Sequence, residues 1–179
     1  IITGIGQGFI QTTPIQLCLM TAQIANGGYK IYPRIVTSEQ EQPIDKFTPL
    51  YKKSKNIKII QNAMFSSTNE VRGTSYRSRI DDPKYQFAGK TGTAQVKRIT
   101  KKDRELDLKT FEIPYEERDH ALYVAFGPYK NPRYAISILI EHGGSGGTVA
   151  APLAKELFKL IIDRHEIRKN FDNKKYLDI

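Results

Sequence analysis

The sequence predicts an α+β fold, in which helices pack on an antiparallel sheet. Segments with helical spacing of apolar residues come first, and the pattern changes to that of β-strands from Tyr85 onward. The last two predicted strands are joined by a short Gly/Pro/Asn turn, which requires them to be antiparallel. A chain of 179 residues is long enough to bury one core.

The first predicted helix begins at Thr13-Pro14 and ends at Asn26-Gly27. Threonine is a favoured N-cap, proline is favoured at the first helical position, and Asn-Gly favours helix termination. Residues 30–36 are expected to form an edge strand or a short strand, because Pro33 has no N–H to donate to a ladder.

A second helix is predicted over 55–66, after a polar loop at 38–49. Its apolar residues recur on one face at helical spacing. These are Ile57, Ile60, Ala63 and Met64.

Three strands are expected at 85–96, 120–127 and 134–141. The last two form a hairpin through the turn Gly127-Pro128-Tyr129-Lys130-Asn131-Pro132. Between the first two strands, residues 97–119 are rich in charge and poor in aliphatic side chains, which predicts a long loop.

A final helix is predicted over 149–164, after the glycine run 143–147. Pro152 suits its first turn, and its apolar stripe should cover the sheet. The stripe consists of Val149, Leu153, Leu157, Leu160 and Ile161. The division expected is 1–166 as folded domain and 167–179 as a polar C-terminal tail.

Composition leaves a second function open. A net charge of +9 and a pI near 9.5 suit a basic, non-catalytic module that binds nucleic acid or an anionic polymer. Steep salt dependence of DNA binding would favour that alternative. Much of the excess charge lies in segments expected to be solvated, such as 97–102, which favours an ordinary charged surface. Cys18 is the single cysteine, so an internal disulfide and a cysteine-based zinc site are excluded.

Two glycine motifs fail on spacing. Gly89-Lys90-Thr91 could end a phosphate-binding loop, but that motif needs glycine at position 84, which is Lys84. Gly4-Ile5-Gly6-Gln7-Gly8 resembles a dinucleotide loop, but Phe9 stands where the third glycine is needed.

The run 143–147 matches the G-x-S-x-G pattern of a serine hydrolase centred on Ser145. That fold needs a mainly parallel sheet, whereas the preceding strand here belongs to an antiparallel hairpin. We therefore interpret the run as a strand-to-helix turn; among the histidines, only His142 lies beside it.

The segment Lys90-Thr91-Gly92-Thr93 is the candidate site. Alternation along a strand puts Thr91 and Thr93 on one face and Lys90 and Gly92 on the other. A peptide could add as a neighbouring strand, with the threonine hydroxyls holding its carboxylate and Lys90 supplying positive charge. The backbone N–H of Thr93 could face a carbonyl under attack, as half of an oxyanion hole. These features suit acyl transfer on a peptide.

Several motifs in order resemble the penicillin-binding protein and β-lactamase superfamily, and most closely the C-terminal part of a class B transpeptidase domain of the elongation type. The resemblance covers residues 4–164. Its motifs are Gly4-Ile5-Gly6-Gln7-Gly8, Thr13-Pro14-Ile15-Gln16-Leu17, Ala25-Asn26-Gly27-Gly28 and Gly89-Lys90-Thr91-Gly92-Thr93-Ala94-Gln95. It implies three strands of a five-stranded sheet, with Lys90 and Thr93 catalytic and Thr91, Gly92 and Thr93 binding substrate.

The chain departs from the family pattern at the nucleophile. No serine has lysine three positions later, so the S-x-x-K motif is absent, and we interpret Ser67-Thr68-Asn69 as a coincidental S-x-N. The chain begins without methionine, which we interpret as a processed or excised piece whose nucleophile lies upstream.

The resemblance implies a peptidoglycan D,D-transpeptidase, an acyltransferase that binds β-lactams and needs no cofactor. It further implies stem peptides and the cell-wall elongation machinery as partners, and a location on the periplasmic face of the inner membrane, anchored by an upstream segment. Alone, the chain is expected to be inactive and to self-associate.

Overall fold

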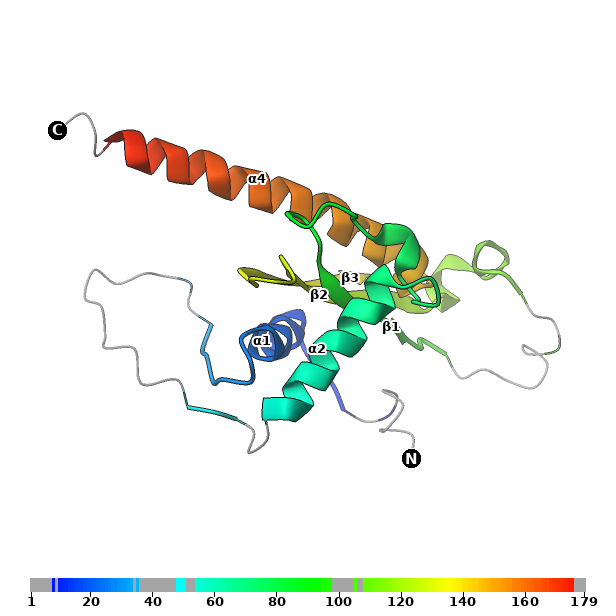
Figure 1. Cartoon of the computed structure of the whole chain (residues 1–179). Helices are drawn as coiled ribbons and strands as arrows, with labels where there is room; N and C mark the ends of the chain where they lie inside the picture. The colour runs from blue at the N-terminus through cyan, green and yellow to red at the C-terminus, as the bar shows by residue number, and fades with distance from the viewer. Residues whose placement is uncertain are drawn as a thin grey trace.

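A three-stranded antiparallel sheet lies between one long helix and two shorter helices in a computed structural model of the chain (Figure 1). The structure describes residues 8, 10–33, 35, 48–50, 54–97, 105 and 108–175, and the side chains of all of these except 54 and 168–175. The main elements are α1 (Pro14–Ala25), α2 (Ser54–Asn69), β1 (Ala88–Ala94), β2 (His120–Gly127), β3 (Tyr134–Ile140) and α4 (Ala151–Lys175). The predicted α+β class is confirmed.

The caps predicted for α1 are present. The side chain of Thr13 accepts a hydrogen bond from the N–H of Gln16, and the side chain of Gln16 accepts one from the N–H of Thr13 at 2.8 Å. Asn26 is the C-cap residue, and its N–H donates to the carbonyl of Ala22 at 3.0 Å. The two bonds between Thr13 and Gln16 are reciprocal and satisfy backbone N–H groups that the helix itself leaves unpaired.

The strand predicted over 30–36 is wrong for the residues described there, 30–33 and 35. An isolated β-bridge between Tyr29 and Pro49 lies just before these residues. Beside the bridge, the N–H of Lys30 donates to the carbonyl of Thr48 at 2.8 Å. Pro33 lacks the N–H needed to continue a ladder. The predicted loop at 38–49 lies outside the described residues except for 48 and 49.

The sheet has the order β1-β2-β3, and both pairs are antiparallel. The register runs from Ala88 opposite Phe126 to Ala94 opposite His120 on one side of β2. The hairpin is confirmed, whereas β1 is shorter than the predicted 85–96 because the N–H of Tyr85 is engaged in a turn with Asp82.

Two apolar clusters cover the two faces of the sheet. Figure 1 shows α4 on one side of the sheet and α1 and α2 on the other. Phe87, Tyr123 and Phe158 belong to the cluster beneath α4, and the rings of Phe87 and Phe158 stack with centroids 4.9 Å apart. Met64, Ala88 and Phe126 belong to the cluster on the face covered by α1 and α2, and each is buried. Phe87, just before β1, and Ala88, its first residue, thus point into opposite layers.

Helix α4 follows a π-helical turn, Gly146–Ala150, and runs to Lys175. The predicted end near residue 164 was therefore wrong. The sequence from 165 to 175 contains no glycine or proline and many good helix formers, so a polar composition does not prevent the helix from continuing. Residues 176–179 of the predicted tail lie outside the described residues.

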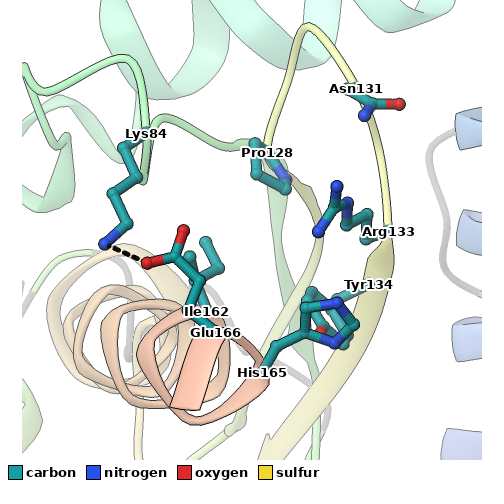
Figure 2. Close-up of a pocket in the computed structure, with 8 residues that line it drawn as sticks. All are labelled: Lys84, Pro128, Asn131, Arg133, Tyr134, Ile162, His165 and Glu166. Atoms are coloured by element: carbon teal, nitrogen blue, oxygen red, sulfur yellow. Dashed lines mark ion pairs between the residues drawn. The ribbon is translucent and has the colours of Figure 1, made fainter. Parts of the chain in front are cut away.

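A polar contact joins α4 to the segment that leads into β1 (Figure 2). The ammonium of Lys84 lies 3.1 Å from a carboxylate oxygen of Asp163 and 2.9 Å from one of Glu166. The hydroxyl of Tyr85 donates to Asp163 at 2.6 Å. Hydrogen bonds from Tyr85 and Lys84 lower the pKa of Asp163 below its ordinary value of 3.8.

Because the folded-state pKa of Asp163 is depressed, its contribution to stability should be present above pH 3.8 and lost as the pH falls through the folded-state value. The difference in unfolding free energy between the native protein and Asp163→Asn should therefore shrink below pH 3.8. Urea titrations on both sides of that pH measure it. Asp81→Asn is the control, since Asp81 pairs with Arg79 at an exposed position. A constant difference would contradict the prediction.

The prediction that the leucines of the α4 stripe cover the sheet is wrong. Leu153, Leu157 and Leu160 are 45%, 40% and 67% exposed on the outward face of α4, whereas Ala154 and Phe158 are buried against the sheet. The smaller Ala154 lets the helix pack closely on the sheet. Contiguous exposed apolar surface favours association. We therefore predict that the isolated chain self-associates and that Leu157→Glu with Leu160→Glu weakens the association. Light scattering over a concentration series tests this, and a monodisperse monomer throughout would refute it.

Candidate active site

Lys90, Thr91, Gly92 and Thr93 all lie on β1, at the edge of the sheet. Phe87 points into the layer beneath α4 and Ala88 into the opposite layer, so alternation places Thr91 and Thr93 on the α4 side. Lys90 and Gly92 are on the other side. The arrangement agrees with the faces expected from the sequence.

The outer edge of β1 is divided into two parts. At its start, the N–H of Gly89 donates to the Thr68 hydroxyl at 3.0 Å, and the carbonyl of Phe87 accepts from the Asn69 amide at 2.9 Å. The side chains of these two α2 residues thus replace a neighbouring strand. Since backbone groups alternate along a strand, those of Thr91 and Thr93 point toward the same outer edge, beyond the end of α2.

The side chains around Thr91 form a row of hydroxyls. The Thr91 hydroxyl lies 3.0 Å from that of Thr74, which lies 3.3 Å from that of Ser67. On the same strand, the Lys90 ammonium donates to the carbonyl of Thr91 at 2.8 Å and is exposed. Cation and hydroxyls together suit a carboxylate, which accepts hydrogen bonds and carries negative charge.

An open groove of about 280 Å³ lies beside Lys90. It is lined by Ala63, Ser66, Ser67, Glu70, Arg72, Gly73, Thr74 and Lys90. Sequence reasoning missed all of these except Lys90. The hydroxyl-rich run 66–68, at the end of a helix, is the available signal in the sequence. Ser67-Thr68-Asn69, which we interpret from the sequence as a coincidental S-x-N, lies against β1 in the structure.

The glycine run after β3 is a site of close packing. A Cβ at Gly146 would lie 2.6 Å from the carbonyl oxygen of Gly92 and would collide with that of Leu122. Ser145 is exposed and makes no capping hydrogen bond, while the ring of His142 contacts Tyr115 and His120. These contacts favour a strand-to-helix turn over a hydrolase nucleophile.

A second cavity, of about 180 Å³, lies between α4 and the β2–β3 turn (Figure 2). Lys84, Pro128, Asn131, Arg133, Tyr134, Ile162, His165 and Glu166 line it. The ammonium of Lys84 points to Glu166, and the ring of His165 lies against that of Tyr134 (Figure 2). None of the lining residues belongs to β1, so this cavity is separate from the candidate active site.

Comparison with known proteins matches residues 1–159 to the family described as penicillin binding protein transpeptidase domain. A peptidoglycan D,D-transpeptidase MrdA of Salmonella typhimurium is 33% identical over 174 residues, and the match covers 89% of this chain and 26% of that protein. The chain thus spans about a quarter of the length of this curated relative.

Solved structures agree with that match. The chain resembles Pseudomonas aeruginosa PBP2 in complex with WCK 5153, with a TM-score of 0.70, 34% identity, and coverage of 89% of this chain and 32% of the other. It also resembles Helicobacter pylori PBP2 in complex with MreC, with a TM-score of 0.67, 33% identity, and coverage of 93% and 27%. The chain therefore belongs to the penicillin-binding protein transpeptidase family, and within it is of the PBP2, or MrdA, type.

Proposed function

We propose that this chain forms the substrate-binding side of the active site of a peptidoglycan D,D-transpeptidase. The observation that carries the proposal is the edge strand β1, where the end of α2 bonds to the backbone of residues 87–89 and the next residue, Lys90, lines the groove. An extended stem peptide can add to such an edge through backbone hydrogen bonds.

The residues of β1 would then have distinct roles. The Lys90 ammonium supplies positive charge, and the hydroxyls of Thr91 and Thr93 bind the terminal carboxylate of the peptide. The N–H of Thr93, on the outer edge, stabilises the negative charge that develops on the carbonyl oxygen. Gly92 has no side chain, so the backbone of a bound peptide can approach β1 closely at this position.

The nucleophile would come from outside the 179 residues, because none of their serines has lysine three positions later. That serine oxygen attacks the carbonyl of D-Ala-D-Ala, D-Ala leaves, and an amine of a second stem peptide displaces the serine to form the cross-link. A β-lactam takes the place of the donor and leaves the serine acylated. The chain alone would perform none of these steps.

The relatives support a proposal about the cellular context. Helicobacter pylori PBP2 was solved with MreC, so we infer a comparable partner in the machinery of cell-wall elongation. We place the site on the periplasmic face of the inner membrane, where peptidoglycan is cross-linked. Among the described residues, no helix is both long and apolar enough to cross a bilayer.

The activity can be tested with the natural full-length protein, a pentapeptide stem ending in D-Ala-D-Ala, and an amine acceptor. We expect release of D-Ala together with a cross-linked product, and neither from the 179-residue chain alone. If a folded full-length protein that contains the nucleophilic serine formed neither product, the proposed function would be contradicted.

A further inference from the structure

Three hydroxyl groups meet in the interior, directly behind β1. Thr68, Ser75 and Tyr123 are 0%, 1% and 0% exposed. The Tyr123 hydroxyl lies 2.9 Å from that of Thr68 and 3.1 Å from that of Ser75. Buried polar groups cost free energy unless they are hydrogen-bonded, so three together call for a structural or functional reason.

Their hydrogen bonds form one directed chain. The Gly89 N–H donates to Thr68 at 3.0 Å, and Ser75 donates to the carbonyl of Ser67 at 3.0 Å. Between these ends, Thr68 can donate to Tyr123, and Tyr123 to Ser75. Burial raises the pKa of Tyr123, which keeps its hydroxyl protonated and able to donate. Longer contacts of Thr68 with Ser75 (3.3 Å) and Met64 (3.4 Å) are weaker.

The chain of bonds connects β1 to three other parts of the fold. Thr68 belongs to α2, Tyr123 to β2, and Ser75 to the segment that follows α2. Gly89 leaves room for Tyr123, since a Cβ there would collide with the Tyr123 hydroxyl. Gly89 also immediately precedes Lys90, so a shift at this bond is transmitted along the strand to Thr91 and Thr93.

We propose that Thr68, supported by Tyr123 and Ser75, is a positioning residue that sets where the edge of β1 lies relative to an incoming substrate. It acts through the Gly89 N–H and touches no reacting atom. For the reaction itself this inference rests on the proposed function. Small displacements of a catalytic group cost large factors in rate, so the loss of a single bond at Gly89 should be measurable.

The test compares Thr68→Val, which keeps the shape but removes the hydroxyl, with Thr68→Ser, which keeps the hydroxyl. Thr21→Val is the matched control, because Thr21 is also fully buried and its hydroxyl donates within α1, to the carbonyl of Leu17 at 2.8 Å. In the full-length protein, two quantities are measured: hydrogen exchange of the peptide covering 87–95, and the acylation rate constant for benzylpenicillin at saturation, separately from initial binding.

We expect Thr68→Val to speed exchange in 87–95 and to lower the acylation rate constant by about tenfold, with a smaller effect on initial binding. Thr68→Ser should restore both quantities, and Thr21→Val should change neither. Unchanged exchange in Thr68→Val would show that Thr68 does not fix the position of β1. Faster exchange with an unchanged acylation rate constant would show that the position of β1 set by Thr68 does not affect the reaction. Either result overturns the inference. A native protein that is never acylated would instead refute the proposed function, and hydrogen exchange would still decide whether Thr68 holds β1.

Discussion

Replacing Lys90 by glutamine in the full-length protein is expected to lower the rate of acylation by benzylpenicillin by about a hundredfold. The Lys90 ammonium is exposed at the groove and bonded to the carbonyl of Thr91. Glutamine keeps a hydrogen-bond donor but removes the fixed charge that would attract the carboxylate of the ligand. Quenched-flow mixing followed by intact-mass spectrometry gives the acylation rate.

The control for that experiment is Lys130→Gln, which removes the same charge from the exposed turn between β2 and β3. It should leave the acylation rate unchanged. Equal rates for the native protein and Lys90→Gln would mean that Lys90 is an ordinary surface residue of an edge strand.

Gly146→Ala is expected to destabilise the protein by about 3 kcal/mol, near the upper end for overpacking a close contact. The new Cβ would meet the backbone carbonyls of Gly92 and Leu122, which belong to two paired strands and cannot move independently. Because one of the displaced groups is on β1, the acylation rate should fall as well. Calorimetric unfolding and acylation kinetics measure the two effects.

Ser145→Ala provides the neighbouring control, since Ser145 is exposed and makes no capping bond. It should change neither stability nor acylation. Loss of acylation in Ser145→Ala would revive the hydrolase interpretation, and a fully stable Gly146→Ala would show that the turn is less tightly packed than the structure indicates.

Local chemistry explains which elements could be predicted. The ends of α1 follow from Thr13, Pro14 and Asn26, whose caps act within a few residues. The bounds of β2, His120–Gly127, agree with the prediction because the glycine and prolines of the following turn end the strand. The alternation of Lys90 and Thr91 likewise needs no information beyond the strand itself.

Long-range contacts explain what could not be predicted. The end of α2 lies on the edge of β1 because Thr68 and Asn69 bond to the backbone of residues 87–89, a pairing that no local pattern encodes. The groove residues Ser67 and Thr74 were missed for the same reason. Helix α4 extends beyond the predicted end because the apolar residues on which that end was based stop at Ile161, whereas helix propensity can prolong a helix through a polar segment. Which face of α4 packs on the sheet was also not encoded locally, since Ala154 and Phe158 are buried there while Leu153 and Leu157 are exposed.

Intact-mass spectrometry with and without benzylpenicillin tests most directly whether this chain supplies the binding side of an acyl-transfer site and takes its nucleophile from elsewhere. The full-length protein should gain one penicilloyl adduct, and the 179-residue chain should gain none under the same conditions. An adduct on the chain alone would place the nucleophile within it, and the absence of an adduct on the folded full-length protein would contradict the assignment of Lys90 to Thr93 as an active-site strand.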